Sequence, residues 1–554
     1  MKKILYSLLL NLIFTTLVFA QNESKINGQI IVKLTQLAQI QEVAQKLNSS
    51  NRENTNFSIL KTIDEDFKYY LLKVENTTLN DDELLYALRS EKGIEEASFN
   101  YRASPRAVPN DTFFNKQWGM TKIQCEKVWD STTGGKTACN DDIVVVVIEP
   151  GFGFSLKHED ILPNLFVNSG EIANDGKDND GNGYIDDVHG INIATSKGDI
   201  SPDPQAHGTS VCSIIGAKGN NKVGVTGVNW NVKMLLVSDA STEADVIAAY
   251  AYVIKMRKLY NESNGKKGAF IVVTNYSGGI DNVFEQNFPL WCGMYNQLGE
   301  MGILSAGAGP NSNTNVDVKG DIPTTCSSPF LIAVTNSDRT DVKVQNAGFG
   351  PINIDLAAPG GTSSGGGTQV TGSFSARADA TNKAYKEFTG TSAATPFVAG
   401  AIALLYSLKD TSFCKAAKQS PKETALLIKD ILLENVDKTT ALGTQTSSGG
   451  RLNVAKAFEA LKSSLKPTVV TNLALSPNPT NTTLNFRVSS INGKAQTYSI
   501  FNVAGQLVYQ TEYTPKPFSQ NKVSIDVRNL AKGFYTLSTR DDEGNLVSKK
   551  FLVQ

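Results

Sequence analysis

The sequence has almost no net charge and few histidines. Its 53 Lys and Arg residues nearly balance 54 Asp and Glu residues, which gives a formal net charge of -1. No overall field therefore draws the chain to nucleic acid or to anionic lipid, and we expect no nucleic-acid partner. The chain holds three histidines, so a nucleophilic serine would have few possible general bases.

Long hydrophobic runs are also scarce, and the main one lies at the N-terminus. Two lysines precede an apolar stretch that ends in Val18, Phe19 and Ala20, a pattern typical of a signal-peptidase site. The alternative is a membrane anchor, but the run is shorter than the ~20 residues that a span needs. We therefore predict a signal peptide over residues 1–20 and a protein that is secreted or held at the outer cell surface.

Export permits disulfides among the six cysteines. Cys125 and Cys139 would close a short loop ahead of an apolar strand, and Cys292 with Cys326 is a second candidate pair. Cys212 lies in the apolar run VCSIIGA and is expected to be a buried thiol. The cysteines lack zinc-site spacing, so no zinc is expected.

Residues 21–108 are predicted to form a small α+β domain. The segments from residue 26 to residue 103 have the patterns of strand, helix, strand, strand, helix and strand. Asn80 stands three residues before Glu83, a capping-box arrangement that would fix the start of the second helix. The polar, proline-bearing stretch SPRAVPNDTFFNKQ follows, and we predict an exposed linker in which the chain can be cut.

Residues 109–465 are predicted to form an α/β domain. Continuous β-branched runs occur at Ile143–Gly151, Val232–Ser238 and Ala269–Gly279, separated by helical patterns. Continuous hydrophobicity indicates strands that are covered on both faces, and hence a mostly parallel, doubly wound sheet. In such sheets, sites form beyond the carboxyl ends of the strands.

Residues 466–554 are predicted to form an antiparallel β-sandwich. Short alternating strands are separated by turns such as SPNPTN and DDEGN, and the segment has neither histidine nor cysteine. A carbohydrate-binding adhesin would need exposed aromatic platforms here. Its aromatic residues Tyr498, Phe501, Tyr509 and Tyr535 lie in the strands and are expected in the core instead.

Two segments place chemistry at the start of a helix. His207 precedes an apolar run in AHGTSVCSIIGA, and Ser392 opens the helical stretch TSAATPFVAG. Pro396 is expected in the first helical turn, where no amide hydrogen is needed. A helix start has free backbone donors and a positive dipole end, which suit a developing oxyanion.

These two segments resemble the histidine and serine signatures of the subtilases, the subtilisin-like serine peptidases. The match consists of HGT before an apolar stretch, GTSxAxPxVAG, and the order acid, His, Ser along the chain. The resemblance implies a subtilisin-like fold and a peptide or protein substrate. It also implies that Ser392 is the nucleophile and His207 the general base.

The third member of the triad departs from the family pattern. Subtilases carry an aspartate at the end of the first strand, whereas here VVVIEPGFG places Glu149 at that position, followed by Pro150. The resemblance implies that Glu149 orients His207 with a side chain longer by one methylene. The alternative is a decayed site, and hence a catalytically silent subtilase-fold protein that binds partners at the cell surface.

The resemblance also implies an oxyanion donor and a substrate-binding strand. GILSAGAGPN ends in Asn311, where subtilases carry an asparagine that points at the tetrahedral intermediate; a shifted register would place Ala308 there instead. The segment NYSGG resembles the strand that pairs with the substrate backbone. Its candidate substrate-binding residues are Tyr276, Ser277, Gly278 and Gly279.

An acidic loop, NDGKDNDGNGYIDDVHG, has the D-x-D-x-N-G spacing of a calcium site. Its twelfth position is a histidine rather than a glutamate, so an aspartate would have to close the site. The alternative is an Asx-rich surface turn. The predicted ligands of a structural calcium ion are Asp178, Asp180, Asn182, Tyr184 and Asp187.

The flanking domains have resemblances of their own. Residues 21–108 resemble the inhibitory propeptide of subtilases, which implies that the chain is a zymogen and that the domain's partner is its own peptidase domain. Residues 466–554 resemble the type IX secretion sorting domain, through SPNP, IFNVAGQLV, KGFYTLS and the terminal KKFLVQ. The implied partner of this segment is the type IX export machinery.

Overall fold

The computed structural model describes residues 25–49, 55–101, 107–362, 373–377, 379–465, 475, 478–490, 496–513, 519–540 and 546–554. The predicted signal peptide and the first residues of the predicted linker lie outside this set. The chain divides into two units, residues 1–105 and 106–554.

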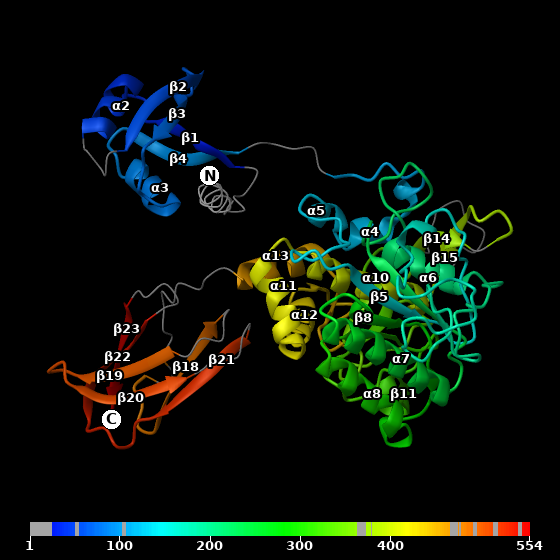
Figure 1. Cartoon of the computed structure of the whole chain (residues 1–554). Coiled ribbons are helices and arrows are strands. Elements are labelled where there is room, and N and C mark those ends of the chain that lie inside the picture. The colour runs from blue at the N-terminus through cyan, green and yellow to red at the C-terminus, as the bar shows by residue number, and fades with distance from the viewer. Residues whose placement is uncertain are drawn as a thin grey trace, which may run out of the picture. The chain divides into compact units, whose positions relative to one another are not determined.

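The first unit is a four-stranded antiparallel sheet with two helices (Figure 1). Alternate residues of its first strand, Ile30, Val32 and Leu34, point into one core that both helices share. Asn80 and Glu83 form the predicted capping box. The element order agrees with the sequence prediction: β1 (Lys25–Leu34), α2 (Ile40–Ser49), β2 (Asn56–Asp64), β3 (Tyr69–Glu75), α3 (Asp81–Arg89) and β4 (Ile94–Tyr101).

A nine-stranded sheet organises the second unit. Its spatial order is β16-β17-β13-β12-β10-β8-β5-β7-β6, and every neighbouring pair is parallel except β16 with β17. The strands are β5 (Ile143–Ile148), β6 (Gly190–Asn192), β7 (Lys233–Ser238), β8 (Phe270–Tyr276), β10 (Leu304–Ala308), β12 (Leu331–Ser337), β13 (Leu356–Pro359), β16 (Asp437–Lys438) and β17 (Gly450–Arg451).

Helices cover both faces of this sheet (Figure 1). Val145 and Val147 of β5 pack into the apolar cluster that contains α6 and α10, whereas Val144 and Val146 pack into the cluster that contains α7 and α8. The predicted doubly wound, mostly parallel sheet is therefore confirmed. The helices are α4 (Trp118–Lys122), α5 (Cys125–Trp129), α6 (His207–Gly216), α7 (Glu243–Glu262), α8 (Pro289–Glu300), α9 (Val316–Lys319), α10 (Thr391–Tyr406), α11 (Thr411–Gln419), α12 (Pro421–Glu434) and α13 (Val454–Ser464).

Among the described residues of the second unit, two short two-stranded sheets and three 3-10 turns lie outside the main sheet. β9 (Ile280–Asp281) pairs with β11 (Asp321–Ile322), and β14 (Ser373–Arg377) pairs with β15 (Ala384–Phe388), both antiparallel. The 3-10 turns are Phe114–Lys116, Leu162–Asn164 and Glu285–Asn287.

The disulfides correct one sequence prediction and confirm another. Cys139 bonds to Cys414, 275 positions away, so the predicted Cys125–Cys139 bridge is wrong. Cys125 is a buried free thiol at the start of α5. The tertiary fold, rather than the short loop between the two residues, decides which thiol Cys139 meets. The Cys292–Cys326 bridge is confirmed, and Cys212 is a buried thiol as expected.

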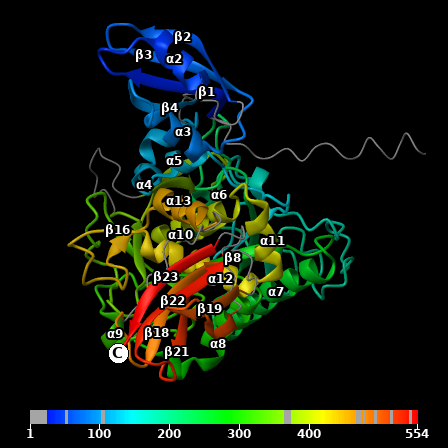
Figure 2. The same cartoon turned by 90° about the vertical axis from the view of Figure 1, so that its left-hand side faces the viewer.

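The C-terminal segment contains two antiparallel sheets, β18-β21 and β20-β19-β22-β23 (Figure 1; all but β20 are also labelled in Figure 2). Residues of both sheets share one apolar core, which includes the buried Tyr498 and Tyr535, whereas Phe501 and Tyr509 are half-buried. The strands are β18 (Thr483–Ser490), β19 (Gln496–Asn502), β20 (Leu507–Tyr513), β21 (Ser519–Asp526), β22 (Gly533–Arg540) and β23 (Leu546–Val553).

Within the described part of the chain, no single helix is long and apolar enough to cross a membrane. Helices α10 and α11 are long and apolar enough only when they are taken together, and they are bent by 112° relative to each other. Every residue of α10 is buried inside the second unit.

Candidate active site

Glu149 directly follows β5 at the carboxyl edge of the sheet. Its backbone amide donates to the carbonyl of Val237, and its carbonyl accepts from the amide of Ala240, so two hydrogen bonds to the neighbouring chain fix its position. The side chain is completely buried. Gly208 makes room for the longer glutamate, because a Cβ at that position would lie 2.9 Å from Glu149 Cγ.

His207 is the first residue of α6 and lies opposite Glu149. The buried carboxylate of Asp203 accepts the backbone amides of His207 at 2.9 Å and of Thr209 at 2.8 Å, and so satisfies donors that the helix start leaves free. The other two histidines contact backbone carbonyls elsewhere, His158 that of Ala384 and His189 that of Phe166.

Glu149 and His207 are joined by a short hydrogen bond, with Oε2 2.5 Å from Nδ1. Burial by itself would lower the pKa of His207, but the charge and hydrogen bond of Glu149, together with Asp203, outweigh it and raise the pKa above its usual value. Burial raises the pKa of Glu149 as well, although His207 opposes this. Because Glu149 holds Nδ1, the other ring nitrogen of His207 is left to exchange protons with a substrate or nucleophile.

Two aromatic rings enclose the imidazole of His207. Phe152 stacks on it with ring centroids 4.9 Å apart, and Phe388 meets it edge-on at 5.3 Å and 87°. Phe388 ends β15, four residues before Ser392, so the chain that leads to the serine is in direct contact with the histidine ring.

Ser392 is the second residue of α10 and is 8% exposed. Its hydroxyl donates to the carbonyl of Ser277 at 3.4 Å rather than to His207. This is long for an O–H···O hydrogen bond, so little energy opposes rotation of the hydroxyl toward the imidazole.

Pro396 corrects an expectation about this helix. It lies inside α10, beyond the first turn, and has no amide hydrogen to donate to the carbonyl of Ser392, four residues earlier. The hydroxyl of Ser277 donates to that carbonyl instead, at 3.3 Å. A hydrogen bond from the neighbouring segment thus replaces the missing helical one and ties Ser277 to the turn that carries Ser392.

Asn311 follows β10 and reaches the same helix start. Its Oδ1 accepts from the amide of Thr391 at 2.9 Å and from the Thr391 hydroxyl at 3.1 Å. Asn311 is exposed, and its Nδ2 makes no hydrogen bond to the described residues, so the amide is oriented with its donor free. Gly390, at φ +101°, passes close by, because a Cβ there would lie 2.8 Å from Asn311 Oδ1.

The segment Tyr276–Gly279 lies beside the serine, although its members differ in role. Tyr276 is a core residue that packs edge-on against Trp291, with centroids 5.6 Å apart, so only its backbone is available to a peptide. Ser277 is buried and bonds to Ser392. Gly278 is half-buried and Gly279 is exposed, so these two present backbone to the outside.

The acidic loop is strongly organised. Asp178 and Asp180 lie with Glu171 so that one carboxylate oxygen from each falls within 4.8 Å of the others. Asn182 and Asp187 are completely buried beside them, where the Asn182 amide and the Tyr252 hydroxyl both donate to Asp187. Burial raises the pKa of Asp187 to about 6. Tyr184 packs its ring edge-on against Tyr252, at 4.8 Å between centroids, and its carbonyl is the atom that the sequence spacing offers as a ligand.

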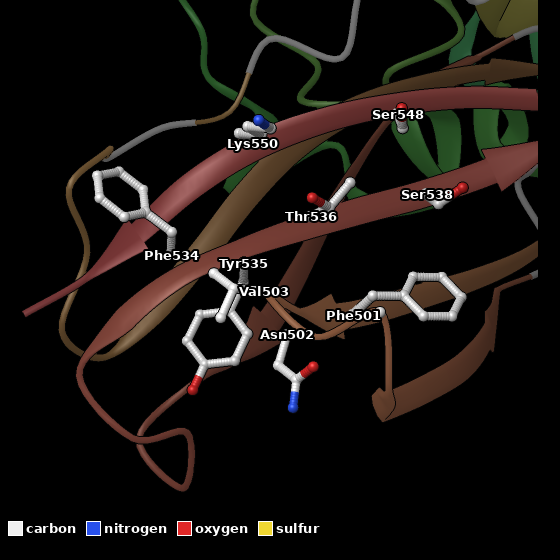
Figure 3. A pocket seen from close by; sticks show the side chains of 10 residues that line it. Phe501, Asn502, Val503, Phe534, Tyr535, Thr536, Ser538, Ser548 and Lys550 are labelled. Atoms are coloured by element: carbon white, nitrogen blue, oxygen red, sulfur yellow. The ribbon is translucent and has the colours of Figure 1, made fainter.

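A cavity of about 720 Å³ lies on the outer side of the four-stranded C-terminal sheet (Figure 3). Its lining contains no histidine and no carboxylate. The lining residues are Phe501, Asn502, Val503, Gly505, Phe534, Tyr535, Thr536, Ser538, Ser548 and Lys550.

Sequence reasoning missed several residues of the candidate site. Asp203 could have been found from the sequence, because an acidic residue shortly before a helix start commonly accepts the free backbone amides of that helix. Glu171 lies just ahead of the aspartates but outside their regular spacing. Phe152 and Phe388 have no such signal, because only the packing of distant segments brings both rings to His207.

Two family models and several known proteins are similar to this chain. A model described as "Subtilase family" matches residues 140–455, and one described as "Secretion system C-terminal sorting domain" matches residues 474–554. Subtilisin-like protease 1 of Plasmodium berghei is 24% identical over 70% of the chain and 59% of its own length. An extracellular protease of Xanthomonas campestris pv. campestris is 26% identical over 61% of the chain and 56% of its own length. The chain thus spans little more than half the length of these relatives.

A solved structure of a Pseudoalteromonas arctica protease is 23% identical, with a TM-score of 0.45. The match covers 64% of this chain and 100% of the solved chain.

Proposed function

Because the chain belongs to the subtilase family, we propose that it is a serine endopeptidase in which Glu149 replaces the usual aspartate. The observation that carries the proposal is the 2.5 Å hydrogen bond between the fully buried Glu149 and Nδ1 of His207. A carboxylate in this position holds the imidazole in one tautomer and stabilises the imidazolium that forms when a proton is taken up.

In the proposed reaction, the Ser392 hydroxyl turns from the Ser277 carbonyl toward His207 and attacks the carbonyl carbon of a peptide bond. The free ring nitrogen of His207 accepts the hydroxyl proton and later delivers it to the leaving amine. The acyl-enzyme on Ser392 is then hydrolysed by water through the same proton transfers in reverse.

The negative oxygen of the tetrahedral intermediate is proposed to lie between Asn311 Nδ2 and the backbone amide of Ser392. The support for this role is that Thr391 fixes Asn311 Oδ1 from the neighbouring position, which orients the donor before a substrate arrives. One such preorganised donor contributes about 3 kcal/mol in the transition state.

The second candidate is a catalytically silent subtilase-fold protein that binds partners. The observation that favours it is that the Ser392 hydroxyl faces Ser277 rather than His207. A serine-directed fluorophosphonate probe separates the two. Labelling of the mature protein that is lost in Ser392→Ala supports the peptidase, and absence of labelling favours the silent protein.

Residues 21–108 are proposed to act as an inhibitory propeptide, so that the chain is made as a zymogen. The support is a separate compact unit with its own core and apolar residues left exposed on β2, namely Ile59, Leu60 and Ile63. Fluorophosphonate labelling that rises when the linker is cleaved would support this role. Equal labelling of the uncut and cut chains would contradict it.

The C-terminal match bears on localisation. A secretion-system sorting domain occupies residues 474–554, so the chain is secreted or held at the outer cell surface. We propose the type IX export machinery as the partner of this domain. Deletion of residues 466–554 should retain the protein inside the cell, and secretion of the shortened chain would contradict the assignment.

A structural calcium ion is proposed at the acidic loop. The donor set fits a hard cation, because the carboxylates of Glu171, Asp178 and Asp180 converge, and the Asn168 and Asn182 amides each donate to both Asp180 and Asp187. Glu171 thus joins the ligands predicted from the sequence. The bound ion would supply fixed positive charge that holds the loop together, and this role is separate from the chemistry at Ser392.

A further inference from the structure

The position of a substrate side chain follows from the two segments that flank Ser392. Ser277–Gly279 leaves the end of β8 and bonds to Ser392, while Gly309 and Pro310 lead from the end of β10 to Asn311. β8 and β10 are neighbouring parallel strands, so both segments leave the same edge of the sheet side by side. In the proposed reaction a peptide carbonyl lies between Ser392 and Asn311, so the residue before the cleaved bond would lie beside these two segments.

The loop Asp321–Thr324 packs against both segments. It begins with β11, which pairs with β9, the direct continuation of Gly279. A Cβ on Gly279 would lie 2.4 Å from the carbonyl oxygen of Ile322, one on Gly307 would lie 2.7 Å from Pro323 Cγ, and one on Gly309 would lie 3.8 Å from Thr324 Cγ2. The loop thus touches both flanking segments, and glycines at the contacts leave no side chain in between.

Asp321 is a buried carboxylate within this loop. It is 1% exposed, and its Oδ2 accepts from the Thr324 hydroxyl at 2.6 Å and from the Thr324 amide at 3.4 Å. Oδ1 makes no hydrogen bond to the described residues, and no Lys or Arg among them pairs with this carboxylate. The charged neighbour is Asp281, its strand partner on β9, and Tyr295 lies near it on α8. Burial, helped by the charge of Asp281, raises the pKa of Asp321 to about 7.

A buried carboxylate without a cation is unfavourable in its charged form unless a cation arrives, and otherwise it takes up a proton. We propose that Asp321 forms the floor of the specificity pocket and selects substrates with arginine or lysine immediately before the cleaved bond. The substrate ammonium or guanidinium group supplies the missing positive charge and hydrogen-bond donors to Oδ1. This inference rests on the proposed peptidase activity and names its substrate class.

The test compares substrates that differ in charge but hardly in shape. Two series of fluorogenic peptides are made, identical except that one carries arginine and the other citrulline before the cleaved bond, and kcat/KM is measured at pH 8.5 on the mature wild-type protein. Because the guanidinium would make a charged hydrogen bond to the buried Asp321, kcat/KM should be about ten- to a hundredfold higher for arginine than for citrulline. In Asp321→Asn the ratio of kcat/KM for arginine to kcat/KM for citrulline should fall to within about threefold. Asp281→Asn makes the same change on the exposed strand partner, and this variant should keep most of the preference for arginine.

The outcomes distinguish this inference from the proposed function. Fluorophosphonate labelling of wild type with equal rates on arginine and citrulline overturns the specificity and leaves the peptidase intact. If Asp321→Asn has a lowered melting temperature but an unchanged ratio, Asp321 only stabilises the loop, and this result also overturns the specificity inference. Absence of labelling in the wild type refutes the peptidase itself. If the Asn variant fails to fold, a wild-type ratio near one still overturns the inference.

Discussion

Glu149→Gln is the most informative substitution, because it removes the charge of the catalytic acid while keeping its size. Glu149 is completely buried, with Oε2 2.5 Å from His207 Nδ1. Two unit charges about 4 Å apart at an effective dielectric constant of about 20 attract each other by about 4 kcal/mol. That stabilisation of the imidazolium disappears in the Gln variant, and about 4 kcal/mol corresponds to roughly a thousandfold in turnover.

The amide adds a second loss. If its N–H group donates to Nδ1, the ring proton moves to the other nitrogen, which must accept the proton of Ser392. The tautomer is then wrong for catalysis, and the total loss approaches about 10⁴-fold. Glu149→Asp is the matched control, because it keeps the charge but withdraws the carboxylate by one methylene, and its loss should be smaller.

The assay is kcat/KM on a peptide substrate as a function of pH, with melting temperature as the check on folding. His207 acts as a base only when neutral, so activity falls as the pH drops through its pKa. Because Glu149 and Asp203 raise that pKa, the acid limb of the wild type should lie above about 6.5, and it should move to lower pH in the Gln variant. A folded Gln variant with wild-type turnover, or an unmoved acid limb, would refute the triad.

Three further predictions concern neighbouring residues. Asn311→Ala should lower kcat by about 10²- to 10³-fold with little change in KM, whereas Asn313→Ala in the same loop should not; equal effects would point to a loop change rather than a lost donor. A chelator should lower the melting temperature of the mature protein, by an amount corresponding to about 2.7 kcal/mol if the ion is present at a hundred times its Kd, and Asp178→Ala should remove that sensitivity; an unchanged melting curve would rule out the metal site. Ser277→Ala should cost about 1–3 kcal/mol in unfolding free energy, because the Ser392 carbonyl loses its donor, and adding Pro396→Ala should restore part of it. A double variant no more stable than the single one would show that the helix does not recover that hydrogen bond.

Local pattern determined much of this protein. Continuous apolar runs predicted the buried strands of the parallel sheet, because a strand covered on both faces has no polar side to expose. The capping box at Asn80 and Glu83 depends on neighbours in sequence, so it was also predictable. The signature segments placed His207 and Ser392 at helix starts, where the structure has them.

Tertiary structure decided what depends on residues far apart in the chain. Cys139 pairs with a cysteine 275 positions away, and no local spacing encodes that choice. The hydrogen bond from Ser277 that replaces the one Pro396 cannot make, and the two phenylalanine rings around His207, arise only when separate segments pack together. The same holds for Asp321, because its burial, in a loop that packs against two glycine-bearing segments, makes it a candidate for substrate selection.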